Sequence, residues 1–212
     1  MNQVSILVDG FNLYHSLVDA EWKLQQCVKW LDIQSLISSY PQVIGGRPVF
    51  SNLDYFSAFA NHRIPTDPDV TRRHQTYLDA LGSTGSKVHL GRFKACKQTC
   101  KICRRSFDRY EEKETDVAIA TGIIEACMDP DMNTQVLVSG DSDLAPALRM
   151  VRRRFLTKRI GIAFPYRRIS EDLKRNCDFH WRLKPEQYLA HQFPFKIQLA
   201  GGRSANRPAP WM

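Results

Sequence analysis

The sequence predicts an α/β fold with a mainly parallel central sheet. Short apolar, β-branched runs such as VSILV (4–8) and TQVLVSG (134–140) are typical of strands that are buried on both faces. Stretches with helical spacing separate these runs, so strands and helices alternate along the chain. The 212 residues, of which 43% are hydrophobic, are enough for one sizeable domain with its own core.

Each expected element has a local signal. Asp32 and Ser170 are residue types that cap helix N-termini, while Pro41 and Gly82 stop helices. The expected strands lie at 4–8, within 47–61, and at 87–93, 134–140, 158–164 and 179–183. The expected helices lie at 11–22, 32–40, 66–82, 113–128, 144–155 and 169–176.

This alternation predicts a single domain over residues 1–190, interrupted by a Cys-rich, basic insert at about 94–107. Residues 191–212 are rich in Gly, Pro and polar residues, so we expect a flexible C-terminal tail.

Composition restricts the class of protein. The net charge of +8 favours an anionic partner, with nucleic acid the first candidate. No apolar stretch is long enough to span a bilayer, and the run after Met1 is too short for the apolar part of a signal peptide. Of the six cysteines, three crowd into one short stretch and three are scattered, which does not resemble a disulfide framework. We therefore expect a reduced, cytoplasmic protein without a membrane partner.

Acidic residues follow two of the expected strands. Asp9 follows the first strand, and Asp141 and Asp143 follow the strand at 134–140. Asp116 lies near the start of the helix before that strand. Taken singly, each is more simply explained as a helix-capping or helix-end acid. Because loops at the carboxyl ends of parallel strands share one edge, the four can converge, and clustered carboxylates suit Mg²⁺ or Mn²⁺.

Four segments together resemble a known family, the NYN domain, a PIN-like, LabA-like group of predicted metal-dependent ribonucleases. They are ILVDGFNLYHS (6–16), KETDVAIATGII (113–124), VSGDSDLAPAL (138–148) and ISEDLKRNCDFHWRL (169–183). The resemblance spans about residues 3–183 and implies a PIN-like, Rossmann-like three-layer fold with a mainly parallel central sheet.

The resemblance also implies site residues. Asp9, Asp116, Asp141 and Asp143 match the acidic residues that hold Mg²⁺ or Mn²⁺, and Asn12 matches the orienting Asn of the first motif. Ser139 matches the small hydroxyl residue before GDSD.

One position departs from the family. Many relatives carry a further Asp where this chain has Gly122. The lost ligand weakens the expected metal site unless Glu114 or Glu125 compensates, and Gly122→Asp is then expected to restore metal affinity.

The insert contains Cys96, Cys100 and Cys103, with the C-x-x-C spacing of zinc ligands. Zinc prefers four ligands, and the candidates for the fourth are His89, Cys177 and His74. One interpretation is a structural Zn²⁺ that holds a basic knuckle for RNA. The alternative is a mobile loop with free thiols.

These features predict a Mg²⁺- or Mn²⁺-dependent endoribonuclease, a hydrolase of RNA phosphodiester bonds. The alternative is a catalytically weakened NYN-domain protein that binds RNA or regulates. Single-stranded RNA is the expected partner, and a homodimer stays open. The expected RNA-binding residues are Arg104, Arg105, Tyr166, Arg167 and Arg168, although most charge runs are only solvated surfaces.

Overall fold

The structure is a computed structural model that describes residues 1–211; the last residue of the expected tail, Met212, lies outside the described residues. Its centre is a six-stranded sheet, and every neighbouring pair of its strands is parallel. The strands in spatial order are β3 (Lys87–Leu90), β2 (Pro48–Ser57), β1 (Asn2–Asp9), β6 (Thr134–Val138), β7 (Arg159–Phe164) and β8 (Phe179–Arg182). The predicted parallel sheet is confirmed, with β1 and β6 in the middle.

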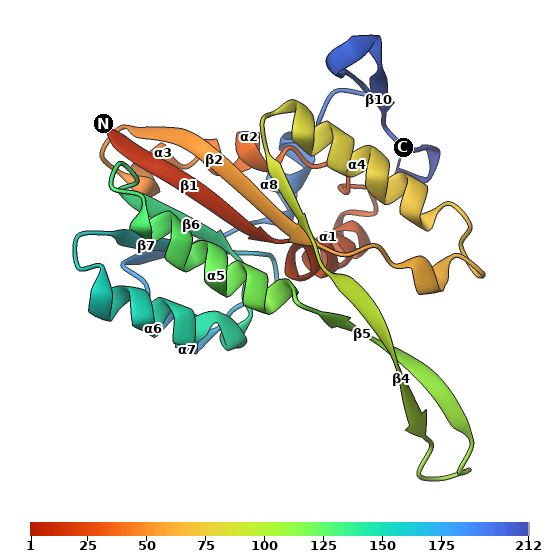
Figure 1. Cartoon of the computed structure of the whole chain (residues 1–212). Helices are drawn as coiled ribbons and strands as arrows, with labels where there is room; N and C mark the ends of the chain where they lie inside the picture. The colour runs from red at the N-terminus through yellow and green to blue at the C-terminus, as the bar shows by residue number, and fades with distance from the viewer. Residues whose placement is uncertain (212) are drawn as a thin grey trace.

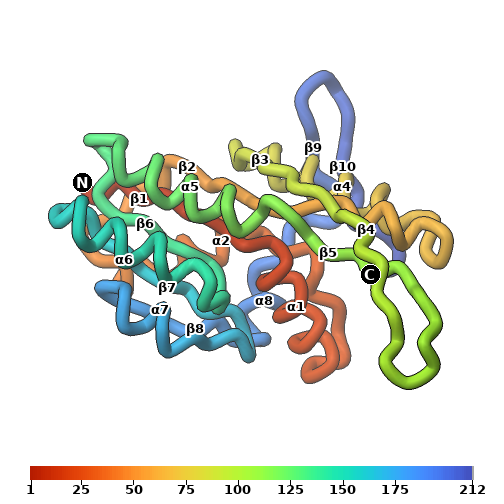
Figure 2. Tube along the Cα trace, turned by 60° about the horizontal axis from the view of Figure 1, so that its bottom comes forward, coloured from red at the N-terminus to blue at the C-terminus, as the bar shows by residue number. Residues whose placement is uncertain are grey.

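Helices cover both faces of the sheet, which gives three layers (Figure 1 and Figure 2). One face carries α1 (Gly10–Leu24), α2 (Ile33–Ser38), α3 (Pro41–Ile44), α4 (Val70–Ser83) and α8 (Pro185–Ala190). The other carries α5 (Thr115–Met128), α6 (Ala145–Arg154) and α7 (Glu171–Arg175).

Side chains of β1 alternate between the two hydrophobic layers. Val4, Ile6 and Val8 pack on the α1 side, and Leu7 packs on the α5 side. All four are at most 1% exposed, because a central parallel strand is covered on both faces. This double burial explains why the strand is a continuous apolar run in the sequence.

The Cys-rich insert is a β-hairpin. Strands β4 (Arg92–Thr99) and β5 (Ser106–Lys113) pair antiparallel from Arg92↔Lys113 to Thr99↔Ser106. The hairpin forms its own two-stranded sheet and extends away from the body (Figure 1). The alternative of a mobile loop is therefore wrong, because backbone hydrogen bonds between the two strands order this segment. Phe107 and Tyr110 are aromatic residues of the kind that favours strands, a signal that the Cys-rich interpretation overlooked.

The expected flexible tail is also corrected for residues 191–211. Strands β9 (Lys196–Gln198) and β10 (Ser204–Asn206) form a second small hairpin. Phe193 and Ala205 are buried, and the ring of Trp211 lies 6.4 Å from Trp30 and 6.2 Å from Tyr77 between centroids. Buried aromatic contacts anchor this segment despite its Gly- and Pro-rich composition.

The predicted caps at Asp32 and Ser170 are confirmed, since each accepts a backbone hydrogen bond from the first turn of its helix. Short 3-10 turns complete the chain at η1 (Asn61–Arg63), η2 (Ser142–Leu144), η3 (Ala200–Gly202) and η4 (Ala209–Trp211). Within residues 1–211, none of the helices combines the length and apolar character that crossing a membrane requires.

Gly10, the first residue of α1, lies where two backbones approach closely. A Cβ built on Gly10 would lie 2.5 Å from the carbonyl oxygen of Phe56 and 2.8 Å from the Tyr55 ring. A side chain there would push α1 away from the end of β2. The Asp-Gly pair after the first strand thus brings helix and sheet together beside Asp9.

We predict that Gly10→Ala lowers the free energy of unfolding by about 1–3 kcal/mol, because the added methyl group clashes with backbone. Gly82→Ala is the control: a Cβ there meets nothing within 4 Å, and Ala gains roughly 0.5–1 kcal/mol over Gly in a helix. Urea denaturation of both variants measures the difference. Equal midpoints for the two variants would contradict this packing.

Candidate functional site

The candidate site lies where β1 and β6 end, at the carboxyl edge of the sheet. Asp9 is the last residue of β1 and is 5% exposed. Ser139, Gly140 and Asp141 follow directly after β6, whose register with β1 pairs Val8 with Val138. Parallel neighbouring strands therefore bring residues 130 positions apart to one place, as the sequence predicts.

Hydrogen bonds tie the two strand ends together. The hydroxyl of Ser139 donates to Asp9 Oδ2 at 2.8 Å and accepts from the backbone N–H of Asp141 at 3.0 Å. The backbone N–H of Asn12 donates to Asp9 Oδ1 at 2.9 Å, and the Asn12 side chain accepts from the N–H of Gly140 at 3.0 Å. We call these four contacts the strand-end network. Asn12 and Ser139 therefore connect the two acidic loops.

The acidic side chains are close enough to influence one another's titration. The pKa of Asp9 is raised to about 6, mainly by burial and also by the charges of Asp141 and Asp116, against hydrogen bonds from Asn12 and Ser139 that lower it. Burial, followed by the charges of Asp141 and Asp143, raises the pKa of Asp116. Asp9, Asp116, Asp141 and Asp143 thus share one electrostatic environment.

Asp141 caps the short turn that follows β6. Its Oδ1 accepts the backbone N–H of Asp143 at 2.9 Å and caps η2. The simpler explanation of Asp143 as a helix-capping acid is wrong, because α6 begins after Leu144 without a side-chain cap. Asp143 is exposed, and its charge contributes to raising the pKa of Asp116.

The donor set at this edge consists of carboxylate oxygens, the ligands that Mg²⁺ and Mn²⁺ prefer. A divalent cation would neutralise the mutual repulsion of these acids. In the part of the chain that the structure describes, no group of three or more His, Cys, Asp or Glu side chains is gathered to ligand distance of one ion. The donor chemistry fits the metal, and the ligand set is a proposal.

Glu112 is a further acid at this edge, and the sequence analysis missed it. It lies on β5, and the charges of Asp9 and Asp116 add to the burial that raises its pKa to about 7. Its Oε1 is buried without a hydrogen-bond partner. The spacing of acids in the sequence carries no signal for Glu112, because only the hairpin fold brings it to the end of β1.

Gly122 lies below the acidic edge, against the sheet. A Cβ at this position would lie 3.1 Å from the Phe56 ring and 3.2 Å from a methyl group of Leu7, both in the buried layer under α5. Of the expected compensating acids, Glu114 forms an ion pair with Arg92 at 2.8 Å and Glu125 is exposed on α5. A side chain at position 122 would therefore contact apolar side chains.

The expected RNA-binding residues lie in two separate groups. Arg104 and Arg105 are exposed at the tip of the β4–β5 hairpin. Tyr166, Arg167 and Arg168 follow β7, and the carbonyl oxygen of Arg168 lies 2.4 Å from a Cβ built on Gly140. This contact places the second group directly beside the loop that carries Asp141.

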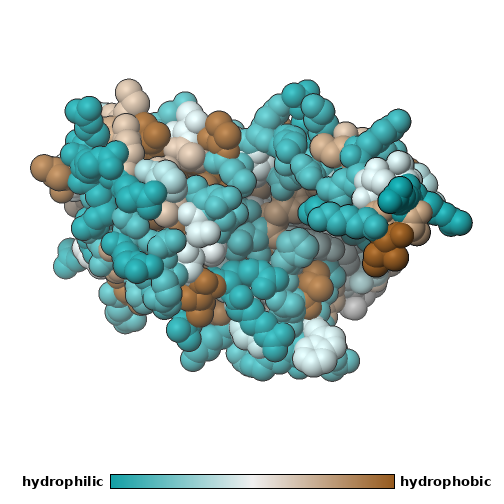
Figure 3. Space-filling model, turned by 90° about the horizontal axis from the view of Figure 1, so that it is seen from below, coloured by the Kyte–Doolittle hydropathy of each residue, from teal (hydrophilic) through white to brown (hydrophobic). Residues whose placement is uncertain are grey.

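Two of the second group have contacts within the protein. Arg168 forms an ion pair with Asp19 at 2.9 Å, and Arg167 lies over the ring of Tyr166 at 5.4 Å. Seen from below, the molecule presents a mostly hydrophilic surface with apolar atoms in separate patches (Figure 3). A polar surface of this kind suits a charged ligand better than an apolar one.

The structure does not bring the three insert cysteines together. Cys96 lies within β4 opposite Arg109, and Cys100 lies beyond the end of that strand. Four residues of strand span about 13 Å, which is too far for two thiolates on one zinc ion. Cys100 and Cys103 do lie together at the tip, where hydrogen bonds from the Cys103 and Ile102 backbone and from the Cys103 side chain lower the pKa of Cys100.

The expected fourth ligands are also engaged elsewhere. His89 Nε2 lies 2.7 Å from Asp54 Oδ1, His74 Nε2 lies 3.4 Å from the Ser57 hydroxyl, and Cys177 donates to the Lys174 carbonyl at 3.4 Å. The basic residues of the insert are therefore positioned by the hairpin itself, and the zinc knuckle finds no support in this geometry.

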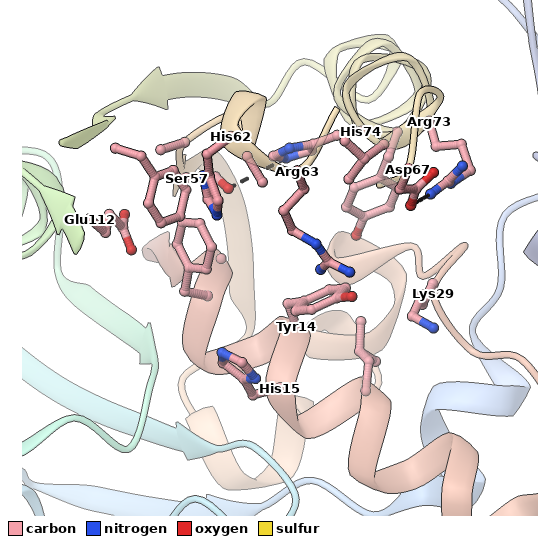
Figure 4. Close-up of a pocket in the computed structure, with 18 of the residues that line it drawn as sticks. Tyr14, His15, Lys29, Ser57, His62, Arg63, Asp67, Arg73, His74 and Glu112 are labelled. Carbon is pink, nitrogen blue, oxygen red and sulfur yellow. Dashed lines mark hydrogen bonds and ion pairs between the residues drawn. The ribbon is translucent and has the colours of Figure 1, made fainter. Parts of the chain in front are cut away.

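A cavity of about 620 Å³ lies next to the acidic edge (Figure 4). We call it the aromatic pocket, because its walls include Phe11, Tyr14, Tyr55, Tyr77, Phe93 and Trp211. Gly10 and Glu112 also line it, so it borders the acidic residues directly. The sequence analysis did not predict this pocket, since its walls come from α1, β2, α4, the hairpin and the C-terminal segment.

The parallel sheet, with acidic residues at the ends of its central strands, defines a PIN-like α/β domain. A family model described as NYN domain matches residues 3–183, and the chain belongs to that family. The resemblance stated from the sequence motifs is thereby confirmed. Membership indicates a nuclease-like function and interaction with RNA.

Two further similarities cover most of the chain. The 6-hydroxy-3-succinoylpyridine 3-monooxygenase of Pseudomonas putida is 24% identical, over 97% of this chain and 74% of that protein. The crystal structure of a protein of unknown function from Vibrio parahaemolyticus superposes with a TM-score of 0.57 at 19% identity, covering 86% of this chain and 93% of that one. The structural similarity supports the fold.

We predict that Gly122→Asp lowers the free energy of unfolding by about 1–3 kcal/mol, because a carboxylate would be pressed against Leu7 and Phe56. Gly122→Ala is the control and should stay within about 1 kcal/mol of wild type, since the helix gain offsets the tight contact. Urea denaturation measures both. A Gly122→Asp protein as stable as wild type that gains Mn²⁺ affinity would restore the expectation from the family pattern.

The second prediction concerns His74 in the aromatic pocket. Burial lowers its pKa from 6.5 to about 4, so the unfolded chain binds the proton more readily than the folded protein between these values. Stability therefore falls as pH decreases from about 6.5 to about 4, by up to about 3 kcal/mol from this residue.

His74→Gln should remove that part of the pH dependence, while His180→Gln, at an exposed position, should leave it unchanged. Urea denaturation at pH 7 and pH 4.5 measures both. The same loss of stability in wild type and His74→Gln would show that His74 is not buried in its neutral form.

Proposed function

We propose that this protein is a Mg²⁺- or Mn²⁺-dependent ribonuclease that hydrolyses phosphodiester bonds of single-stranded RNA. The observation that carries the proposal is the gathering of Asp9, Asp116 and Asp141 into one electrostatic environment at the ends of β1 and β6. Membership of the NYN family and the net charge of +8 support an RNA substrate.

In this proposal Asp9, Asp116, Asp141 and Asp143 hold the metal. The cation would supply an activated water and stabilise charge that develops on the phosphate. The protein contributes orientation: Ser139 and Asn12 fix the carboxylate of Asp9 and the loop after β6. Such fixed partners keep ligands in place before the substrate binds.

Basic residues would hold the RNA strand across the acidic edge. Arg104 and Arg105 are exposed at the tip of the hairpin, and the Tyr166–Arg168 segment lies beside the loop that carries Asp141. Arginines at these positions would bind phosphates, and Tyr166 would offer a ring for stacking. The activity in the name of the Pseudomonas relative stays with that protein, since 24% identity supports only a shared fold.

The decisive experiment measures cleavage of a labelled single-stranded RNA by the purified protein with Mn²⁺, Mg²⁺ or EDTA. We expect metal-dependent cleavage that Asp141→Asn lowers by at least about 100-fold, since even outer-shell partners of a metal account for 10–100-fold. RNA binding should survive, because Asn keeps the side chain's shape and phosphate contacts come from Arg and Lys.

Asp131→Asn is the matched control: it removes one exposed carboxylate that lies between α5 and β6. Cleavage that persists in EDTA and in Asp141→Asn would refute the metal mechanism. Salt-dependent RNA binding without any cleavage would instead favour the second candidate, a family member that binds RNA and has lost turnover.

A further inference from the structure

The aromatic pocket shares a wall with the acidic edge, which suggests a second part of the same ligand site. Gly10, which follows Asp9, lines the pocket, and so does Glu112, whose pKa is raised by burial and also by the charges of Asp9 and Asp116. A ligand with its phosphate at the carboxylates would have the mouth of the pocket beside it. The volume of about 620 Å³ lies within the 300–1,000 Å³ that is usual for small-molecule sites.

The walls of the pocket suit a flat ring. The rings of Phe11 and Phe93 meet edge to face with centroids 5.5 Å apart, and His62 lies 4.6 Å from Phe93. His62 is in turn stacked on Tyr110 at 4.4 Å. Aromatic side chains that are already packed against one another form a rigid surface, so a planar heterocycle stacks on them with little ordering cost.

Polar groups enter the pocket from several sides. Figure 4 shows the guanidinium of Arg63 reaching toward the ring of Tyr14, with His74 and Ser57 behind it. Asp67, the nearby acid, forms its ion pair with Arg73 instead. Arg63 is therefore positioned to bind an electron-rich oxygen of a ligand, either a ring carbonyl or a phosphate.

Two buried polar atoms of the pocket lining lack hydrogen-bond partners: Glu112 Oε1 and His62 Nδ1. A buried polar atom without a partner is energetically unfavourable. Both residues line the same cavity, where a ligand can contact their side chains. An amino or imino group, as on the edge of a nucleobase, would donate to the carboxyl oxygen of Glu112.

We propose that the aromatic pocket holds one base of the RNA strand whose phosphate lies at the acidic edge. The base stacks on Phe11 and Phe93, its polar edge contacts Glu112 and His62, and Arg63 binds an oxygen of the same nucleotide. This inference rests on the proposed nuclease function for its substrate. It adds that the protein reads a base at one position, rather than binding the backbone alone.

The test separates base binding from cleavage by using the Asp141→Asn protein in Mg²⁺, because this variant is expected to bind RNA without cleaving it; the further variants are made in the same protein. A fluorescent single-stranded oligonucleotide is compared with a set in which one position at a time is abasic. We expect one abasic position to weaken binding by about 5- to 100-fold, as for loss of one stacked base, while the others have little effect. Affinity is measured by fluorescence anisotropy.

Two variants test whether that base lies in the pocket. Ala60→Trp fills the cavity and Arg63→Ala removes its cation, so each should abolish the difference between the intact and the abasic oligonucleotide. Arg72→Ala is the matched control, because it removes an exposed arginine of α4 that does not line the pocket. Unfolding midpoints verify that the variants fold. If Ala60→Trp does not fold, the result for Arg63→Ala decides the test.

A uniform effect of every abasic position would overturn the proposal, as would an Arg63→Ala protein that keeps the position-specific loss. Binding of free nicotinate that is tighter than that of any oligonucleotide would also overturn the proposal, if Arg63→Ala abolishes this binding. The pocket would then be assigned to a small heteroaromatic acid. A position-specific effect without metal-dependent cleavage would uphold the base pocket while the proposed nuclease function fails.

Discussion

The carboxylate of Asp9 is buried at the end of the central strand, and the site depends on how that charge is held. A buried carboxylate needs hydrogen bonds, a cation or a proton. Ser139 and Asn12 supply the hydrogen bonds, and each residue also contacts the loop after β6. The strand-end network therefore provides hydrogen bonds to the buried carboxylate of Asp9, and the same contacts fix the position of Asp141.

Close backbone approaches make this arrangement possible. Gly10 lets α1 begin against the end of β2, and Gly140 lets the loop after β6 lie on the carbonyl of Arg168. Both glycines lie beside an acid of the site. The compact edge leaves room on one side for the aromatic pocket and on the other for the basic segment after β7. The aromatic pocket and the basic segment thus both adjoin the acidic edge.

Local patterns predicted the sheet and the acids well, because these depend on short-range signals. The apolar runs of β1 and β6, the caps at Asp32 and Ser170, and the shared edge of Asp9 and Asp141 all follow from periodicity and the geometry of parallel strands. The environment of Gly122 could not be predicted in this way, because a missing carboxylate in a motif does not reveal that the position faces Leu7 and Phe56.

Features that depend on long-range packing escaped prediction. The cysteine spacing of the insert suggested zinc, whereas cross-strand pairing makes a hairpin that separates Cys96 from Cys100. That same hairpin delivers Glu112 to the site. The C-terminal segment has the composition of a loose tail, yet Trp211 packs on Trp30 and Tyr77 and forms a wall of the pocket.

The central claim is that the acids at the ends of β1 and β6 form a binding site for a divalent cation. Titration of the purified protein with Mn²⁺, followed by electron paramagnetic resonance of the free ion, tests it without reference to any substrate. The account predicts saturable Mn²⁺ binding that Mg²⁺ displaces and that Asp9→Asn abolishes, with the folded state verified by circular dichroism. Absence of saturable binding in the wild-type protein, or equal binding in Asp9→Asn, would contradict it.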